Sequence, residues 1–168
     1  GIYEANPERA REIGIKHQIK TFSSLEELCF SVDGLGIASP TPTHFPIAKL
    51  AMEMGCHVLI EKPFCETEEE AIQLQALSKA KGLVCQVGFL ERFRLEKMMG
   101  GHPIPQTAHL ESHRLSVSVG REVAVDVVSD LMIHDLDLIL SIAKEEPQKI
   151  TAEGFSVVTD YLDFAKVT

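Results

Sequence analysis

The N-terminal half of the chain alternates short apolar runs with helical patterns, and this alternation limits the fold more than any other feature. Apolar runs of strand length occupy residues 35–38, 58–60 and 83–89, and amphipathic helical patterns occupy 45–54 and 67–80 between them. Strands that alternate with helices in this way pair in parallel, because each crossover helix returns the chain to the same end of the sheet. The pattern predicts an α/β domain with a parallel sheet and helices on both faces.

Capping signals mark where the predicted helices begin. Thr67-x-x-Glu70 and Ser24-x-x-Glu27 are capping boxes, and Asn6-Pro7 supplies an N-cap followed by a proline in the first turn. The residues just before Asn6 have the character of a strand end. We therefore expect four mutually parallel strands, near residues 1–4, 35–38, 57–61 and 83–88.

The start of the chain lacks a glycine-rich turn. A nucleotide-binding sheet carries G-x-G-x-x-G after its first strand and at the opening of a helix. Gly34-Leu35-Gly36 lies too early in its own strand to serve this purpose. Because residue 1 falls inside a predicted strand, we expect the first βα unit of the sheet to be absent from this sequence.

Glu61-Lys62-Pro63 follows the apolar run 58–60 directly. A buried parallel strand delivers the residues after it to the carboxyl edge of the sheet, where open α/β folds bind ligands. A lysine held at a mostly apolar strand end can have its pKa lowered toward the range of an acid/base group, and Pro63 permits a cis bond. The alternative is a solvated Glu-Lys pair on an ordinary loop.

Glu4 lies at the end of the strand expected at residues 1–4. An acidic residue at this position of a dinucleotide-binding sheet accepts hydrogen bonds from the adenine ribose and repels a 2′-phosphate, which favours NAD over NADP. The alternative is an acidic residue placed before a helix N-terminus by the helix macrodipole.

A second group of polar residues lies in an apolar segment near the end of the chain. On one helix, Asp130, His134, Asp137 and Ser141 share a face, and leucine, isoleucine and methionine cover nearly all the rest, so we expect the segment to be largely buried. A carboxylate one turn from a histidine raises the basicity of the imidazole, which gives a general base. A core histidine tied to a structural aspartate is the alternative. A metal site is disfavoured, since catalytic zinc needs another nitrogen or sulfur ligand.

Composition narrows the functional classes. The sequence has 168 residues, of which 45% are hydrophobic, and no apolar run approaches the roughly 20 residues of a membrane span. The net charge of −9 argues against a nucleic-acid or anionic-membrane surface. The four cysteines have no CxxC or metal-type spacing, which is typical of reduced thiols in a cytoplasmic protein.

Taken together, these motifs resemble the glucose-fructose oxidoreductase/inositol dehydrogenase family, also called Gfo/Idh/MocA. The resemblance implies a Rossmann-type NAD(P)-binding domain over residues 1–93, without its first βα unit, and part of an α+β domain with an open antiparallel sheet over 94–168. Segments around 116–121 and after 160 are short for loops of the family, so we expect residues to be missing there. The resemblance also implies a homo-oligomer.

The resemblance assigns roles to individual residues. Pro40, Thr41 and His44 would lie along the cofactor, and Glu61 and Lys62 near the nicotinamide. It implies hydride transfer from a secondary alcohol to NAD, with NADP the less favoured cofactor. In that reaction, the proton would go to His134, while Lys62 polarises the same oxygen and Asp130 orients the histidine.

A branch of the family that contains UDP-N-acetylglucosamine 3-dehydrogenases has similar strings at 91–93, 113–115 and 130–137. This similarity implies a sugar or sugar nucleotide as substrate, with Arg92 and Asp137 as substrate-binding residues. Four arginines are candidates for contacts with a diphosphate, with ordinary surface arginines as the alternative: Arg92, Arg94, Arg114 and Arg121. Two other functions stay open, a reductase of C=N or C=C bonds and a sensor that binds without turnover.

Overall fold

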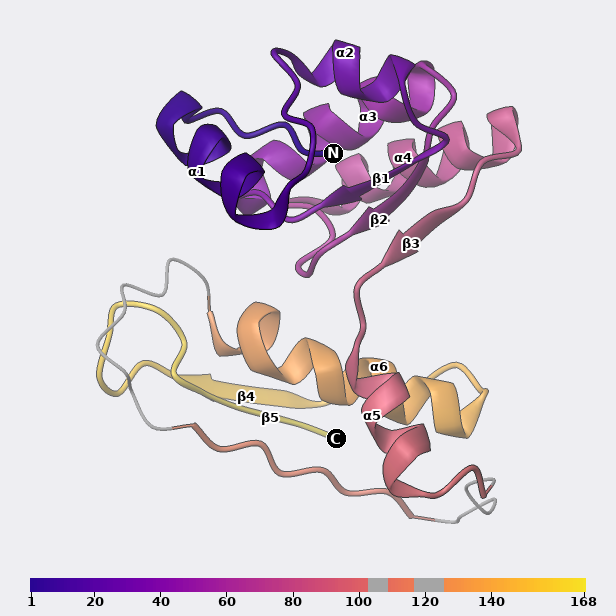
Figure 1. Cartoon of the computed structure of the whole chain (residues 1–168). Coiled ribbons are helices and arrows are strands. Elements are labelled where there is room, and N and C mark those ends of the chain that lie inside the picture. Colours follow the sequence, from indigo (N-terminus) through magenta and orange to yellow (C-terminus); the bar gives the residue numbers. More distant parts are fainter. Residues whose placement is uncertain (103–108, 117–125) are drawn as a thin grey trace. The chain divides into compact units, whose positions relative to one another are not determined.

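The computed structural model describes residues 1–102, 109–116 and 126–168 (Figure 1). The chain divides into two compact units, Gly1–Gly88 and Phe89–Thr168. Most of the segment 116–121, where we expected missing residues, lies outside the described part of the chain, as does Arg121.

The first unit contains a three-stranded parallel sheet. Its strands are β1 (Gly34–Ile37), β2 (His57–Ile60) and β3 (Cys85–Val87), in the spatial order β1-β2-β3. Ile37 lies opposite Ile60 in the register of β1 and β2. The predicted parallel pairing of these three strands is confirmed.

The core of this unit lies between the sheet and the helices α3 (His44–Glu53) and α4 (Glu68–Lys81) (Figure 1). Alternate residues of the strands point to the same face. Burying a valine, leucine, isoleucine or methionine side chain contributes about 1.5–3 kcal/mol to folding. The buried members of the core are Cys29, Ile37, Ala48, Ala51, Met52, Cys56, Val58, Ile60 and Leu74.

The opposite face of the sheet is open in the described residues. Leu59 is 47% exposed, and its neighbours Gly36 and Gln86 on the flanking strands are exposed as well. We expected helices on both faces, but α3 and α4 both pack on the face that carries Val58 and Ile60. The strand pattern alone predicts that helices are present and leaves open which face each helix covers.

The predicted helix starts are confirmed in the first unit. Asn6 Oδ1 accepts hydrogen bonds from the backbone N–H groups of Glu8 and Arg9 at the start of α1 (Pro7–His17). Ser24 caps α2 (Leu25–Phe30) in the same way. Thr67 Oγ1 accepts a hydrogen bond from the backbone N–H of Glu70, 3.2 Å away, at the start of α4.

The strand expected at residues 1–4 is reduced to one bridge. Ile2 pairs in parallel with Thr21, and Phe22 N–H donates to the Ile2 carbonyl oxygen at 2.9 Å. This bridge is separate from the three-stranded sheet in the described residues. A single pair of hydrogen bonds is too short to count as a strand, although its direction agrees with the prediction.

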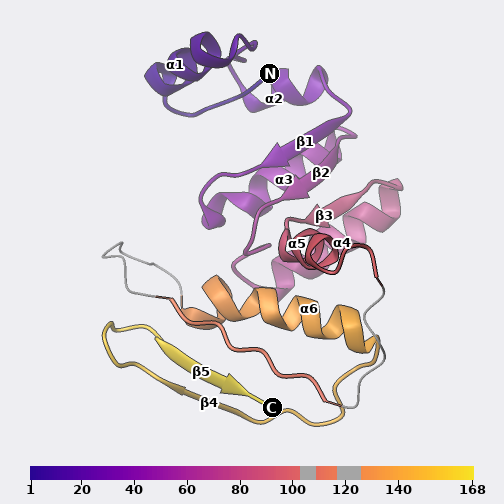
Figure 2. The ribbon, with the colours of Figure 1, turned by 60° about the horizontal axis from the view of Figure 1, so that its bottom comes forward.

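The second unit combines three helical segments with an antiparallel hairpin (Figure 2). Its helices are α5 (Glu91–Met98), the π-helix η2 (Val128–Met132) and α6 (Ile133–Ala143). Its strands are β4 (Ala152–Phe155) and β5 (Phe164–Val167), which pair in antiparallel fashion. The predicted change from a parallel to an antiparallel sheet along the chain is confirmed.

The hairpin is held at its turn by one carboxylate. Asp163 Oδ2 accepts hydrogen bonds from the backbone N–H groups of Val157, Val158 and Thr159, at 2.8, 2.7 and 2.9 Å. The hydrogen bonds from Thr159, Val158 and Val157 hold the pKa of Asp163 far below its ordinary value. The carboxylate of Asp163 therefore stabilises the conformation of the turn.

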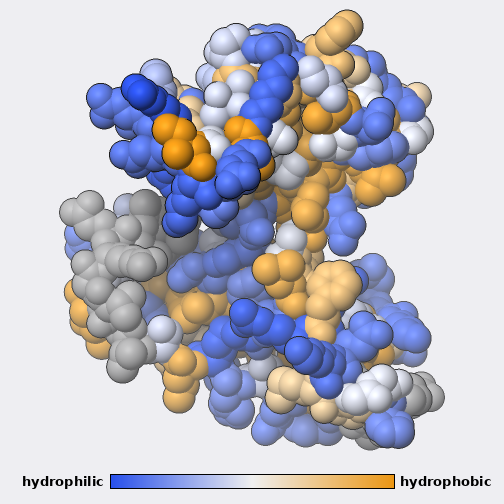
Figure 3. All heavy atoms as spheres, viewed as in Figure 1, coloured by the Kyte–Doolittle hydropathy of each residue, from blue (hydrophilic) through white to orange (hydrophobic). Residues whose placement is uncertain are grey.

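Apolar side chains reach the surface in both units (Figure 3). In the hairpin, the stacked rings of Phe155 and Phe164 are 56% and 48% exposed. No helix in the described part of the chain has both the length and the apolar character to cross a membrane.

Candidate active site

The carboxyl edge of the sheet carries the Glu61-Lys62-Pro63 turn. Glu61 N–H donates to the Ile37 carbonyl oxygen at 2.9 Å, which continues the ladder between β1 and β2 by one residue beyond the strand. The bond between Lys62 and Pro63 is cis. Lys62 thus lies at the edge that the sequence predicted, directly after β2 and partly exposed.

Glu61 lies against Gly88, the residue that directly follows the neighbouring strand β3. A Cβ atom added to Gly88 would lie 3.1 Å from Glu61 Oε2 and 3.3 Å from its Cδ. Gly88 N–H also donates to the Ile60 carbonyl oxygen at 2.7 Å, so its backbone has little freedom to move away. The absent side chain of Gly88 makes room for the carboxylate of Glu61.

The loop between β1 and α3 forms the other part of this edge. It contains a turn of 3₁₀-helix, η1 (Thr41–Thr43). Thr43 Oγ1 lies 2.6 Å from Ser39 Oγ and 2.7 Å from the Pro40 carbonyl oxygen, which ties the loop to itself. Pro40 is exposed and Thr41 is partly exposed, so both are available to a ligand, as the predicted cofactor contacts require.

His44 has a different environment from Pro40 and Thr41. Its side chain is 1% exposed. Nδ1 lies 2.9 Å from the carbonyl oxygen of Pro63, and Nε2 lies 2.8 Å from the carbonyl oxygen of Ser39. With both ring nitrogens facing backbone oxygens in the interior, the imidazole has no polar atom left for a ligand. The predicted contact of His44 with the cofactor therefore does not fit its position.

Glu4 lies just before the N-terminus of α1, as the second interpretation of its sequence position expected, and its contact with the ribose stays a prediction. Its Oε1 accepts a hydrogen bond from Asn6 N–H at 3.1 Å, just before α1, and its Oε2 lies 3.5 Å from Arg9 Nε. The side chain keeps 25% of its surface exposed. It lines an open hollow of about 500 Å³, together with Tyr3 and Phe22.

The helix that carries Asp130 and His134 is interrupted. Asp130 lies in the π-helix η2, whereas His134, Asp137 and Ser141 lie in α6. A π-helical turn has i→i+5 hydrogen bonds, which rotates Asp130 relative to the straight helix that we expected. In the segment 126–143 Asp137 is buried and nearly all the other residues are partly buried, with Leu140 45% exposed, so the segment is largely covered without being a fully buried helix.

Asp137 is paired with Arg92, the other residue predicted to bind substrate. Arg92 Nε donates to Asp137 Oδ2 at 2.6 Å, and the second guanidinium nitrogen contacts Oδ1, which makes the pair bidentate. The hydrogen bond to Asp137 raises the pKa of Arg92. Asp137 is 7% exposed and Arg92 is 52% exposed, so the carboxylate anchors an arginine whose outer surface stays accessible.

Two other arginines proposed for a diphosphate are also paired with carboxylates. Arg114 donates to both oxygens of Asp135, at 2.8 and 3.1 Å. Burial would raise the pKa of Asp135, but the hydrogen bonds from Arg114 and Ser112 lower it below the ordinary value. Arg94 lies 2.7 Å from Glu91. The sequence did not indicate these pairs, because the partners of Arg92 and Arg114 are far away along the chain.

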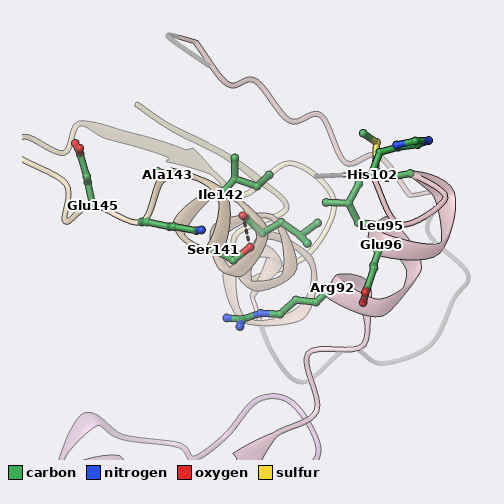
Figure 4. Close-up of a pocket in the computed structure, with 11 residues that line it drawn as sticks. Arg92, Leu95, Glu96, His102, Ser141, Ile142, Ala143 and Glu145 are labelled. Carbon is green, nitrogen blue, oxygen red and sulfur yellow. Dashed lines mark hydrogen bonds between the residues drawn. The ribbon is translucent and has the colours of Figure 1, made fainter. Parts of the chain in front are cut away.

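The second unit also contains a hollow that the sequence did not predict (Figure 4). It has a volume of about 630 Å³ and lies between α5 and the C-terminal end of α6. Ser141 lines it while its hydroxyl donates to the Leu138 carbonyl oxygen at 2.7 Å. Residues of both helices and of the segment after α6 surround it: Arg92, Leu95, Glu96, Ser141, Ile142, Lys144 and Glu145.

Metal and thiol chemistry have little support in the described part of the chain. No group of three or more His, Cys, Asp or Glu side chains there could hold a metal ion. The four cysteines are free thiols. Burial raises the pKa of Cys29 to about 11, and Cys65 has the same shift, so both stay protonated and unreactive at neutral pH.

Comparison with known proteins decides the family. Residues 1–89, which include β1, β2, β3 and the Lys62 turn, match the family model GFO_IDH_MocA, described as an oxidoreductase family with an NAD-binding Rossmann fold. The chain belongs to the Gfo/Idh/MocA family. The predicted family and the predicted Rossmann-type sheet are thus both confirmed.

Individual Gfo/Idh/MocA relatives differ in substrate. UDP-N-acetylglucosamine 3-dehydrogenase of Acidithiobacillus ferrooxidans is 38% identical over 98% of this chain and 53% of its own length. The NAD⁺-dependent scyllo-inositol 2-dehydrogenase of Bacillus subtilis is 27% identical over 86% of the chain and 45% of its own length. A structure of the former enzyme, GnnA, has a TM-score of 0.89 and covers 99% of this chain and 56% of its own. The chain therefore spans about half the length of these relatives.

Proposed function

We propose that the protein is an NAD-dependent dehydrogenase that oxidises a secondary alcohol of a sugar or sugar nucleotide. The observation that carries the proposal is the placement of Lys62 directly after β2, at the carboxyl edge of a parallel sheet that belongs to an NAD-binding family. The similarity to a UDP-N-acetylglucosamine 3-dehydrogenase supports a sugar nucleotide as the substrate.

The residues along the carboxyl edge suit a dinucleotide. Pro40 and Thr41 present an ordered, accessible loop next to the Lys62 turn, and Glu61 lies beside them on the neighbouring strand end. Glu4 would hold the adenine ribose hydroxyls, which favours NAD over NADP. When bound, NAD⁺ supplies the acceptor for the hydride.

Lys62 and His134 divide the handling of the hydroxyl group in this proposal. Lys62 donates to the reacting oxygen and stabilises its developing negative charge, and His134 takes the proton. Asp130 orients His134. Correct placement of the reacting groups supplies the larger share of the barrier reduction, since effective molarities reach about 7–11 kcal/mol in well-oriented reactions.

Arg92 would contact the substrate through the face of its guanidinium group that Asp137 leaves exposed. Asp137 holds Arg92 in one orientation through two hydrogen bonds, which lowers the entropy cost of binding. We further propose that the protein acts as a cytoplasmic homo-oligomer without a nucleic-acid partner, which is consistent with its net charge of −9 and its free thiols.

The test is NADH formation by the full-length protein with a panel of UDP-sugars, other sugar nucleotides and inositols. We expect turnover with at least one sugar nucleotide, and loss of turnover with little change in NAD⁺ affinity in Lys62→Met, which keeps most of the side-chain volume. Lys49→Gln, an exposed change on α3, serves as the control.

Two outcomes of this assay and two companion measurements would favour other functions. No NADH formation with the panel, together with NADH consumption on adding imines or enones, would point to the C=N or C=C reductase. Saturable binding of a sugar nucleotide without NADH formation at any pH would point to a sensor, since a sensor needs no group that polarises a reacting oxygen.

A further inference from the structure

The Lys62 turn is held at both of its ends. Before Lys62, the backbone N–H of Glu61 donates to the Ile37 carbonyl oxygen at 2.9 Å. After Lys62, the carbonyl oxygen of Pro63 lies 2.9 Å from Nδ1 of His44. The first contact is an ordinary continuation of the sheet, whereas the second depends on one buried side chain from another element.

His44 connects the two loops that form the carboxyl edge. Its Nε2 lies 2.8 Å from the carbonyl oxygen of Ser39, in the loop that follows β1, while its Nδ1 faces the residue after Lys62. A carbonyl oxygen only accepts a hydrogen bond, and a neutral imidazole has one N–H to donate, which lies on Nδ1 in the arrangement that holds Pro63. The imidazole is 1% exposed, so water cannot replace a partner that is removed. The loss of either contact therefore leaves a buried polar group unpaired, which destabilises the loop.

We propose that His44 is a positioning residue for Lys62. By holding the Pro63 carbonyl against the loop of Ser39, His44 fixes the backbone on the far side of Lys62 and thereby the direction in which the ammonium group points. The inference rests on the proposed role of Lys62 at the reacting oxygen, and it gives His44 a function different from a cofactor contact.

Two substitutions separate the two contacts of the ring. The side-chain amide nitrogen of asparagine reaches the place of Nδ1, and that of glutamine reaches the place of Nε2. His44→Asn therefore places a donor at the Pro63 carbonyl oxygen and leaves the Ser39 carbonyl oxygen without a contact, whereas His44→Gln does the opposite. Each variant keeps one of the two contacts of the ring, so a purely structural role would make them equally harmful.

If the Pro63 contact positions Lys62, the two variants differ in kcat. We expect His44→Asn to stay within about threefold of the native kcat and His44→Gln to fall by about tenfold or more, with KM for NAD⁺ changed by less than about threefold in both. Melting temperatures of both variants, and the exposed Lys49→Gln on the same helix, provide the controls. Equal losses of kcat, or a greater loss in His44→Asn, would overturn the inference.

A double variant tests whether His44 acts through Lys62. In the Lys62→Met background, His44→Gln should lower the residual kcat by less than about twofold, because the group that it positions is already gone. A full tenfold loss in that background would overturn the inference alone. Native-like turnover of Lys62→Met would instead overturn the proposed function, and this inference with it.

The native protein offers a test that needs no folded variant. A His44 that donates to Pro63 carries a proton on Nδ1, and burial makes that proton exchange slowly with water. We expect a slowly exchanging Nδ1–H signal in the NMR spectrum of the ¹⁵N-histidine-labelled full-length protein. The absence of a proton on Nδ1 under assay conditions would contradict the proposal.

Discussion

At the scale of single residues, Lys62 and His44 have their positions fixed by different parts of the structure. Lys62 lies at the carboxyl edge, because all strands of a parallel sheet end at the same edge and Lys62 follows the end of β2. His44 was assigned to the cofactor from its loop, but the ring turns inward to two carbonyl groups. A motif fixes the position along the chain, and the rotamer that selects the partner depends on neighbours distant in sequence.

Gly88 provides the first prediction at this scale. Gly88→Ala should displace the Glu61 carboxylate by a few tenths of an ångström, because the new Cβ would lie 3.1 Å from Oε2. We expect kcat/KM to fall by about three- to tenfold with little loss of thermal stability. In a Glu61→Ala background the same change should have almost no effect, and an undiminished loss there would show that the carboxylate is not the group displaced.

Glu4 provides the second prediction. Glu4→Ser removes the charge that would repel a 2′-phosphate and releases Arg9, whose Nε lies 3.5 Å from Oε2. We expect kcat/KM with NADP⁺ to rise by about tenfold relative to that with NAD⁺. Glu8→Ser, in the first turn of α1, is the matched control and should leave the ratio unchanged. An unchanged ratio in Glu4→Ser would remove Glu4 from the cofactor site.

At the scale of helices and strands, sequence patterns within a few residues predicted where helices begin, but not how the helices pack. The N-caps at Asn6, Ser24 and Thr67 are in place, because a cap is decided within a few residues. The π-helix at 128–132 was missed, since no short-range pattern in the sequence marks an i→i+5 turn. The packing of α3 and α4 on one face of the sheet was also missed, since the strand pattern does not indicate which face each helix covers.

The β4-β5 hairpin provides a prediction about pH. The pKa of Asp163 is lowered by folding, so its contribution to stability is present above the ordinary pKa of about 4 and is lost as the pH falls through the lower folded value. Asp163→Asn should therefore lower the melting temperature at pH 7 by a few degrees and have a smaller effect below about pH 3. Asp160→Asn in the same turn is the control, and thermal melts monitored by circular dichroism give the comparison. An Asp163→Asn effect that is equal at both pH values would contradict the role of the charge.

At the scale of the whole molecule, the family was predictable because separate motifs, at Glu4, at Glu61-Lys62-Pro63 and over 130–137, occur in a fixed order along the chain. Composition supported this identification without deciding it, as many α/β proteins share an acidic net charge. The ion pairs of Arg92 and Arg114 with the two aspartates of α6 were not predictable, because they join segments more than twenty residues apart.

Cofactor binding provides the prediction at this scale. If NAD⁺ binds the native full-length protein, a concentration of 100 times its Kd stabilises that protein by about 2.7 kcal/mol. The melting temperature should rise with NAD⁺ and rise less with the same concentration of NADP⁺. A larger shift with NADP⁺ would reverse the predicted cofactor preference.

The alternation of burial along β2 also has a consequence for folding. Val58 and Ile60 are 2% and 0% exposed, whereas Leu59 between them is 47% exposed. A slip of the strand by one residue would exchange these two sets of side chains between the interior and the open face. A misregistered pairing is therefore less stable than the native one, which favours a single register of β1 and β2.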